Sequence, residues 1–361
     1  MLKKLIKRTA FTMAGGGQAT PIFGLTTRRI AFTMAEILLS LTIIGVVAAI
    51  TLPSLTGNIN ERTWNTQRKA LHSRLSQAFS LMPQIRGYGT LSVTTMPDSG
   101  WTKQAFSSNN ATEAFLTNGL AKVFKLNNIC DADHLNDCGI PDQMIKYGGG
   151  SKVNLTGNAL RTLADLNKNY SSMGCARYST VYTLAAAFET ANGESILVHY
   201  NPLCKDNLSG TISLGGHDVS DPYVPAVSIM CANFIYDLNG KKGPNTMGKD
   251  MGIMTLMYPT DSILVSPDIA NKNFNFTGTW QAATQYCKGL GDDSRLPNME
   301  ELAALLVNDK FLPDSSGNWD TLWSSTKVEN NRVWAGWIGG DTNMSRRGLT
   351  ENNFALCVKR N

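Results

Sequence analysis

The chain has 361 residues, which allows two or three domains. Hydrophobic residues make up 42% of it and charged residues 17%, so the composition is that of a folding chain and excludes a largely disordered one. The formal net charge is +5, but residues 1–31 hold several basic and no acidic side chains, so the remainder is close to neutral and gives no support for nucleic-acid binding.

The N-terminus combines a basic leader, residues 1–31, with a long apolar run. The run extends from Ile37 through Leu52, and one carboxylate, Glu36, comes directly before it. Its length suits a membrane-spanning helix, which needs roughly 17–25 residues, and the leader would orient that helix by the positive-inside rule. A carboxylate is costly in such a segment, so Glu36 is a functional candidate.

Residues 31–36, AFTMAE, resemble the processing site of type IV prepilins and type II secretion pseudopilins. In that family a peptidase cuts before a Phe and the new amine is often methylated. Glu stands at the fifth mature position, and Pro is favoured at the twenty-second. Cleavage between Ala31 and Phe32 would put Glu36 and Pro53 at those positions. One departure is Ala31, because the family usually has Gly before the cut.

An ordinary signal peptide or signal anchor is the alternative for this segment. A signal peptide has a shorter apolar region with its cleavage site after it, whereas here the motif precedes a longer run. A plain anchor would need neither Glu36 nor the AFTMAE motif. The letters AFTMA also occur at residues 10–14, but three glycines follow them and no Glu would stand fifth, so we reject processing there.

The residues beyond Pro53 follow a helical period and predict one long helix from Phe32 to about Met82. Its first part, residues 32–55, is expected to span the membrane, and its second part to pack on a globular head. Pro53 is expected to kink the helix, and a proline at position 83 ends the pattern. The apolar stripe consists of Trp64, Leu71, Leu75, Ala78, Phe79 and Met82.

Residues 56–270 are predicted to form a pilin-like head, a periplasmic or surface body of α+β class with an antiparallel sheet after the long helix. The dipeptide Asn192-Gly193 predicts a hairpin. We expect a short helix at 111–126 and strands at 182–188, 195–200, 227–236 and 252–257.

Residues 237–250 are rich in glycine and in oxygen-bearing side chains. Calcium is a candidate cofactor here, because a hard cation prefers oxygen ligands and secretion pseudopilins often carry a calcium loop. The alternative is a tight connection that needs positive φ angles. An EF-hand is excluded because its closing Glu is absent. The candidate ligands are Asp237, Asn239, Asn245 and Asp250.

Seven cysteines all follow residue 129, and their odd number leaves at least one thiol over. Disulfides are plausible if this part is exported. The spacing of Cys130 and Cys138 suits a local disulfide loop and is too wide for a zinc knuckle. The sequence leaves open how Cys175, Cys204 and Cys231 pair.

From Thr279 the motifs change character. The segments TWQAATQYC, RLPNMEEL, WSST and CVK resemble, in order and spacing, a bacterial C-type-lectin-like module that covers residues 279–361. The resemblance implies a disulfide between Cys287 and Cys357, which would tie the first helix to the last strand. Asn298 and Glu301 are expected to form a helix capping box.

Sugar binding is not expected of this module. The triplets used for calcium-dependent sugar recognition in that superfamily are absent. Trp334 and Trp337 form either an exposed ligand patch or part of the core, and we expect the core. The module is expected to fold alone and to act by binding or display.

The chain shows no metalloprotease, serine-hydrolase, phosphate-loop or dinucleotide fingerprint, so we do not expect an enzyme. The resemblances imply a minor pilin or pseudopilin of a type IV pilus-like or type II secretion filament. It would be a single-pass inner-membrane protein before assembly and part of a periplasmic or cell-surface filament afterwards. The implied partners are other pilin or pseudopilin subunits, the prepilin peptidase and an inner-membrane assembly platform, with no nucleic acid.

In that function Glu36 would pair with the Phe32 amine of a neighbouring subunit and select the correct stagger. The alternatives are a membrane-tethered surface adhesin or ligand-binding protein that is not assembled, and a secreted enzyme.

Overall fold

The computed structural model divides the chain into two units, Met1–Gly57 and Asn58–Asn361, which we treat separately. The structure describes residues 34–86, 111–166, 183–200, 229–258, 262–271, 275–313, 320–328, 331–338 and 344–359.

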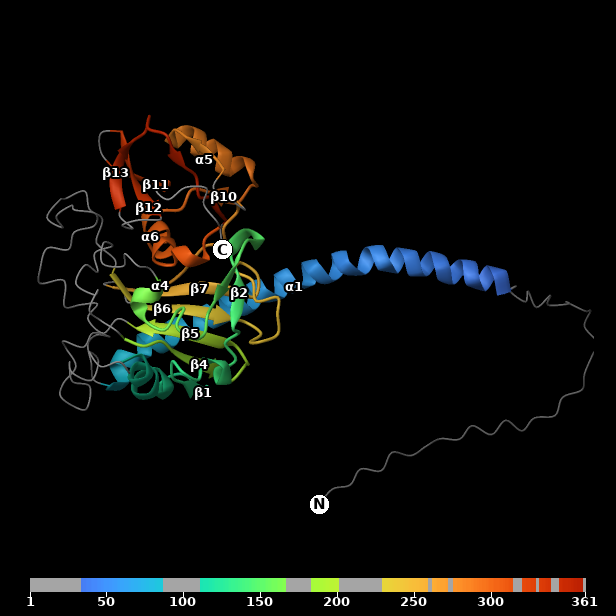
Figure 1. The fold of residues 1–361 in the computed structure, drawn as a ribbon, viewed down its shortest axis with the longest axis horizontal. Helices are drawn as coiled ribbons and strands as arrows, with labels where there is room; N and C mark the ends of the chain where they lie inside the picture. The colour runs from blue at the N-terminus through green and yellow to red at the C-terminus, as the bar shows by residue number, and fades with distance from the viewer. Residues whose placement is uncertain are drawn as a thin grey trace, which may run out of the picture. The chain divides into compact units, whose positions relative to one another are not determined.

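An antiparallel sheet of six strands forms the centre of the second unit (Figure 1). All neighbouring strands in it run antiparallel. In spatial order the strands are β1 (Leu126–Cys130), β4 (Ala186–Thr190), β5 (Ser195–Tyr200), β6 (Ile229–Asp237), β7 (Met251–Tyr258) and β8 (Ser262–Val265).

The predicted hairpin at Asn192-Gly193 joins β4 to β5. Gly193 adopts φ +85°, and its N–H donates to the carbonyl oxygen of Thr190 over 3.0 Å. A side chain would be strained at that φ angle, which explains why an Asn-Gly dipeptide was a usable signal.

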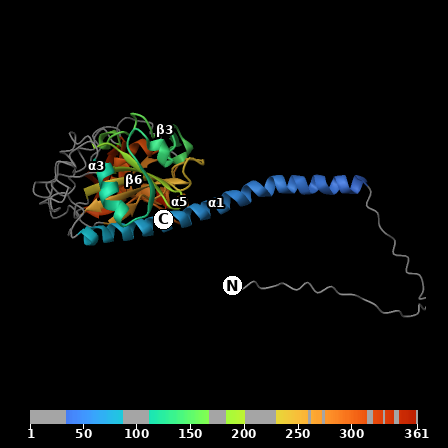
Figure 2. The same ribbon diagram turned by 90° about the horizontal axis from the view of Figure 1, so that it is seen from below.

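Helix α1 (Met34–Arg86) extends through the end of the first unit into the second. In the second unit its predicted apolar stripe is confirmed, since Leu71 and Leu75 are fully buried and Phe79 is 1% exposed. Figure 2 shows this later part of the helix running beside the sheet. The Phe79 ring lies 5.5 Å, centroid to centroid, from that of Phe234 in β6.

The two faces of the six-stranded sheet are covered by different parts of the chain. Neighbouring side chains of a strand point to opposite faces. Phe234 contacts α1, whereas Asn233 hydrogen-bonds to Asn308, which caps the C-terminal end of α6 (Met299–Val307). The sheet therefore lies between α1 and α6.

The predicted helix at 111–126 is shorter than expected. It begins as α3 (Ala111–Ala114), continues as a π-helical turn, η2 (Phe115–Gly119), and ends as a 3-10 turn, η3 (Leu120–Lys122). Gly119 has φ −105° and ψ −83°, outside helical geometry, and from Leu126 the chain pairs with β4 instead.

Short elements surround β1 and the following loops. They are η4 (Leu135–Cys138), β2 (Gln143–Ile145), η5 (Tyr147–Gly149), β3 (Lys152–Asn154) and α4 (Leu163–Leu166), and β2 pairs with β3.

The C-terminal part of the second unit has its own five-stranded sheet, a two-stranded sheet and two helices. The five strands, in spatial order, are β13 (Met344–Gly348), β12 (Arg332–Ile338), β11 (Asp320–Val328), β14 (Asn353–Phe354) and β9 (Thr277–Gly278). The remaining elements are α5 (Trp280–Gly289), α6, η8 (Asp309–Phe311) and the pair β10 (Ser294–Arg295) and β15 (Val358–Lys359).

The C-terminal part shares its main core with the six-stranded sheet. Leu302, Leu305 and Leu306 of α6 are fully buried in the same hydrophobic cluster as Phe234. A second, smaller hydrophobic cluster includes Cys287, Trp323 and Cys357. We therefore revise the expectation that residues 279–361 fold alone, because separation would expose the apolar face of α6.

The prediction of a membrane-spanning first half is corrected. Among the helical residues that the structure describes, no stretch is both long and apolar enough to cross a membrane. The prediction of a single-pass inner-membrane protein is corrected with it. Two disulfides indicate an oxidising compartment.

Candidate functional site

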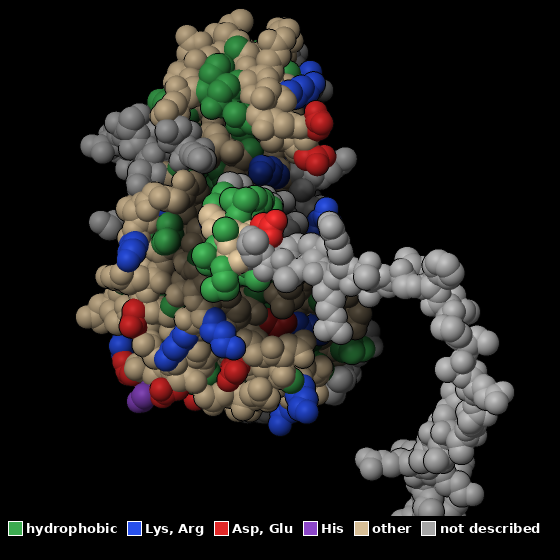
Figure 3. Space-filling model, turned by 90° about the vertical axis from the view of Figure 1, so that its right-hand side faces the viewer, with side chains coloured by type: hydrophobic (Ala, Val, Ile, Leu, Met, Phe, Trp, Pro, Cys, Tyr) green, Lys and Arg blue, Asp and Glu red, His purple; other side chains and the backbone are tan. Residues whose placement is uncertain are grey.

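The first candidate site is the apolar segment of α1, which we define as residues 34–47. All of its side chains are exposed, with Met34 at 77% and Leu39 and Ile44 at 63% each. Figure 3 looks toward this end of α1 and shows the hydrophobic side chains gathered there. Soluble proteins rarely expose so much contiguous apolar surface without a partner.

The exposed apolar side chains of this segment point in every direction around the helix. Successive residues of an α-helix are turned by about 100°, so positions 37, 41 and 44 lie on one side and positions 39, 43 and 46 on the other. A single groove covers only one side of a helix, whereas a helix that is apolar all round is buried among several neighbours. The larger exposed residues are Ile37, Leu38, Leu39, Leu41, Ile43, Ile44, Val46 and Val47.

The polar side chains of the apolar segment do not make it hydrophilic. The hydroxyls of Ser40 and Thr42 each donate to a backbone carbonyl oxygen four residues earlier, over 2.7 Å. Glu36 is exposed in the first turn, where a carboxylate favours the positive end of the helix dipole. Glu36 is the single acidic residue in positions 34–47.

The other predicted assembly residues are only partly described. Ala31 and Phe32, the predicted cleavage pair and methylation site, lie outside the described residues. Pro53 lies within α1, but its side chain is not among those described, so the predicted kink stays a prediction.

The second candidate site is the loop between β6 and β7, residues 237–250. Asp250 accepts hydrogen bonds from the backbone N–H groups of Asn245 and Thr246, over 2.8 and 2.9 Å. Asn245 has φ +50° and Gly240 φ +63°, so the loop has the positive φ angles of a tight connection. Asp250 thereby fixes the shape of the loop.

Three side-chain oxygens of this loop are buried without a hydrogen-bond partner: Oδ2 of Asp237, Oδ1 of Asn239 and Oδ1 of Asn245. Burial raises the pKa of Asp237 to about 8, and the charge of Asp250 adds to this effect. Unsatisfied buried oxygens cost free energy, and carboxylate and amide oxygens are the ligands that calcium prefers. These oxygens are of the type that a hard cation binds, and the calcium site stays a prediction.

A calcium site in this loop would use amide and carboxylate oxygens alone. Among the described side chains, no three or more histidine, cysteine or acidic residues cluster in a way that could hold a metal ion. A zinc-like or multi-carboxylate centre is therefore not found in that part of the chain.

Both disulfides expected from the sequence are formed. Cys130 is bonded to Cys138, and Cys287 to Cys357. The second bond joins α5 to the segment before β15 and is fully buried. Cys175 and Cys204 lie outside the described residues.

The described tryptophan of the two candidates for an aromatic patch, Trp334, belongs to the core. Trp334 is 1% exposed, as expected, and the Trp337 side chain is not among those described. The predicted capping box is present, since the Glu301 N–H donates to Asn298 Oδ1 and the Asn298 N–H donates to Glu301 Oε2, each over 2.8 Å.

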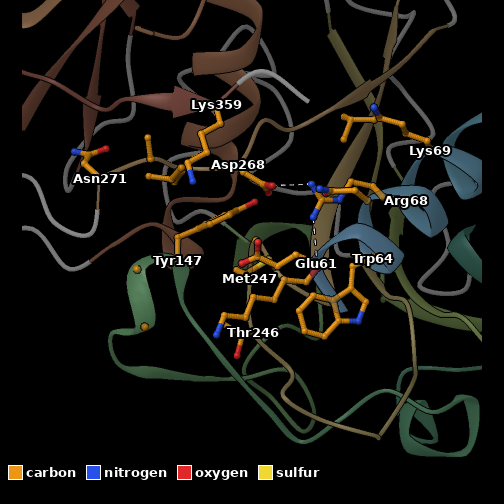
Figure 4. Close-up of a pocket in the computed structure, with 18 of the residues that line it drawn as sticks. Glu61, Trp64, Arg68, Lys69, Tyr147, Thr246, Met247, Asp268, Asn271 and Lys359 are labelled. Carbon is orange, nitrogen blue, oxygen red and sulfur yellow. Dashed lines mark hydrogen bonds and ion pairs between the residues drawn. The ribbon is translucent and has the colours of Figure 1, made fainter. Parts of the chain in front are cut away.

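Sequence reasoning missed a cavity of about 920 Å³ in the second unit, lined by α1 and by four segments distant from it in the sequence (Figure 4). The one available signal was Arg68, a cation at helical spacing between Trp64 and Leu71 of the buried stripe.

Comparison with known proteins supplies no relative: no protein-family model, curated protein or solved structure matches the chain.

Proposed function

We propose that this protein is a structural subunit of a type IV pilus-like or type II secretion filament, a minor pilin or pseudopilin. The observation that carries the proposal is the apolar segment of α1, exposed on all sides. Burying such a segment needs several helices around it, and helical packing of identical or related subunits supplies them. The occupants of this surface are thus the corresponding segments of other subunits.

Glu36 selects the stagger between subunits in this proposal. Once several apolar helices surround it, its carboxylate loses water, and an unpaired buried charge is strongly destabilising. The N-terminal amine that cleavage creates at Phe32 offers a partner of opposite charge on the adjacent subunit. A subunit shifted along the filament axis would leave both charges unpaired.

The rest of the chain supports the same proposal. The later part of α1 packs its apolar stripe on the antiparallel sheet, so the helix that carries the apolar segment is anchored in a folded body. Two disulfides suit a protein displayed in an oxidising compartment. A cation such as calcium at residues 237–250 would satisfy the unpartnered oxygens of that loop.

Replacement of Glu36 tests the proposal. Glu36→Ala is expected to leave export and leader cleavage intact and to remove the protein from sheared, purified filaments. Glu36→Asp should be intermediate, because its shorter side chain reaches the neighbouring amine less well. The matched control is Glu61→Ala, which removes an exposed carboxylate elsewhere on α1. Incorporation of Glu36→Ala at the wild-type level would contradict the charge pairing.

The processing step has its own measurement. Mass spectrometry of the mature chain should find Phe32 as the first residue, methylated on its amine. A mature chain that begins at Met1 or Phe11 would rule out the processing site. A processed protein that stays monomeric would instead favour the alternative of an unassembled adhesin or ligand-binding protein.

A further inference from the structure

A fully buried histidine, His199 of β5, lies where the six-stranded sheet meets the C-terminal part of the chain. It stands directly opposite Asn233 of β6, so the two side chains point to the same face of the sheet. Asn233 hydrogen-bonds to Asn308 at the end of α6. His199 therefore lies on the face of the sheet that α6 covers, and the filament proposal gives it no role.

The imidazole ring of His199 has one described hydrogen-bond partner. Its Nε2 lies 2.9 Å from the carbonyl oxygen of Leu160, and a carbonyl oxygen can only accept, so Nε2 carries the proton of the neutral ring. The other nitrogen, Nδ1, is buried and has no partner among the described residues. Protonation would place an N–H donor and a positive charge at this nitrogen, where those residues offer no acceptor.

The segment that His199 binds comprises residues 159–166, which we call the covering segment. Besides the bond from His199 to Leu160, the carbonyl oxygen of Ala159 accepts from Lys310 Nζ of η8 over 3.2 Å. The covering segment therefore links β5 to the C-terminal part, and one of these links ends on the imidazole ring. Two of its leucines are fully buried in the main core: Leu160 and Leu166.

The surroundings of the ring favour its neutral form. Burial lowers the pKa of His199 from its ordinary 6.5 to about 4. Of the charged groups that act on it from the described residues, Asp165 of α4 attracts a positive charge and Lys310 of η8 repels it. Asp165 is already engaged, because its Oδ2 accepts from the N–H and the hydroxyl of Thr162 over 2.7 and 2.8 Å.

We propose that His199 is a pH-sensitive switch: protonation of its ring releases the covering segment from β5 and from Lys310 while the rest of the second unit stays folded. Local opening brings the imidazolium into water, so acid favours the open form. Opening also uncovers Leu160 and Leu166. The switch does not depend on the filament proposal, because it makes no use of the apolar segment of α1.

The size of the effect follows from the proton affinity of the ring in the two forms. In the open form the ring is hydrated and has an ordinary pKa of about 6.5, whereas in the closed form its pKa is about 4. The closed form binds fewer protons, so its advantage is complete above pH 6.5 and is lost as the pH falls towards 4. Between pH 7.5 and pH 5 the opening constant should rise about thirtyfold.

The test is amide hydrogen exchange of the purified full chain at pH 7.5 and pH 5, followed by mass spectrometry and corrected for the intrinsic effect of pH. Peptides from the covering segment should show the thirtyfold rise, and peptides from α5 should show none. His199→Gln keeps an N–H donor for Leu160 but takes up no proton, so it should abolish the rise. His72→Gln, which removes a histidine of α1, is the matched control and should keep it.

A second measurement uses the unmodified chain, so the test holds even if His199→Gln fails to fold. Exchange of the carbon-bound hydrogen between the two ring nitrogens, followed by mass spectrometry, gives the protonation midpoint of each histidine. For His199 it should lie below about 5. A midpoint near 6.5, equal changes in the covering segment and α5, no change in the covering segment, or an undiminished rise in His199→Gln would overturn the proposal.

Discussion

The amide pair Asn233 and Asn308 offers a quantitative test of how the C-terminal part is built into the protein. Both side chains are fully buried. Asn233 Nδ2 donates to Asn308 Oδ1 over 2.9 Å, and Asn308 Nδ2 donates back to Asn233 Oδ1 over 3.0 Å and to the carbonyl oxygen of Ala304 over 2.9 Å. The pair connects β6 of the six-stranded sheet to the end of α6.

Asn308→Ala is expected to lower the free energy of unfolding by about 3 kcal/mol. It leaves the buried Asn233 Nδ2 without an acceptor, at about 1–3 kcal/mol, and it removes hydrogen bonds worth about 1 kcal/mol each. Thr255 Oγ1, 3.4 Å from Asn233 Oδ1, still partly satisfies that oxygen, so the loss should not be larger.

The assay is urea unfolding of the full chain, followed by circular dichroism and tryptophan fluorescence. Both signals should report one coincident transition, because α6 and the six-stranded sheet share a core. In a double-mutant cycle with Asn233→Ala, the double mutant should lose about 1–3 kcal/mol less unfolding free energy than the sum of the two single losses. Asn271→Ala is the control. The buried amide of Asn271 hydrogen-bonds to the backbone of Ala355 and Cys357, so the losses of unfolding free energy from Asn271→Ala and Asn233→Ala should be additive.

Additive losses in the Asn233 and Asn308 cycle would refute the inferred coupling. Two separated unfolding transitions would refute the shared core and restore an independently folding C-terminal module.

Three further predictions concern pH, the disulfide and the cation. Burial lowers the pKa of His199 to about 4 from its ordinary 6.5, so stability should be complete above pH 6.5 and fall by about 3 kcal/mol as the pH drops through 4. His199→Gln should remove that part of the pH dependence of urea unfolding. Cys357→Ser opens a loop with a sequence separation of 70, which the chain-entropy model values at about 4 kcal/mol, and it should leave leader cleavage unchanged. Peptide mapping of exported protein that finds both cysteines as free thiols would contradict this bond. Calcium at 100 times its dissociation constant should stabilise the full chain by about 2.7 kcal/mol in thermal unfolding, an effect that Asp237→Asn abolishes and Asp292→Asn keeps. An equal effect of calcium on the unmodified chain, Asp237→Asn and Asp292→Asn would contradict a cation site at this loop.

Local signals predicted much of the fold. The stripe that contains Leu71 and Phe79 is buried as its helical spacing indicated, the Asn192-Gly193 hairpin is formed, and Asn298 caps α6. Each of these features is made by residues that lie close together in the sequence, so the local sequence pattern is enough to predict it.

Long-range packing was not predictable in the same way. Nothing in the sequence pairs Asn308 with Asn233, 75 positions away, so the C-terminal part was expected to stand alone. The cavity residues Arg68 and Tyr147 come from distant segments and meet only in the folded unit. The apolar run through Leu52 predicted a membrane span, whereas no helical stretch among the described residues is both long and apolar enough to cross a membrane.

The most direct test of the filament proposal is site-specific photo-crosslinking from the apolar segment of α1 in intact filaments. Ile37 and Val46 lie on opposite sides of the helix, so a photoreactive residue at either position should crosslink to the apolar segment of another subunit. Glu36→Ala should abolish both crosslinks. Crosslinks from one side only, or none between subunits, would contradict the account that this segment is buried among several neighbouring helices.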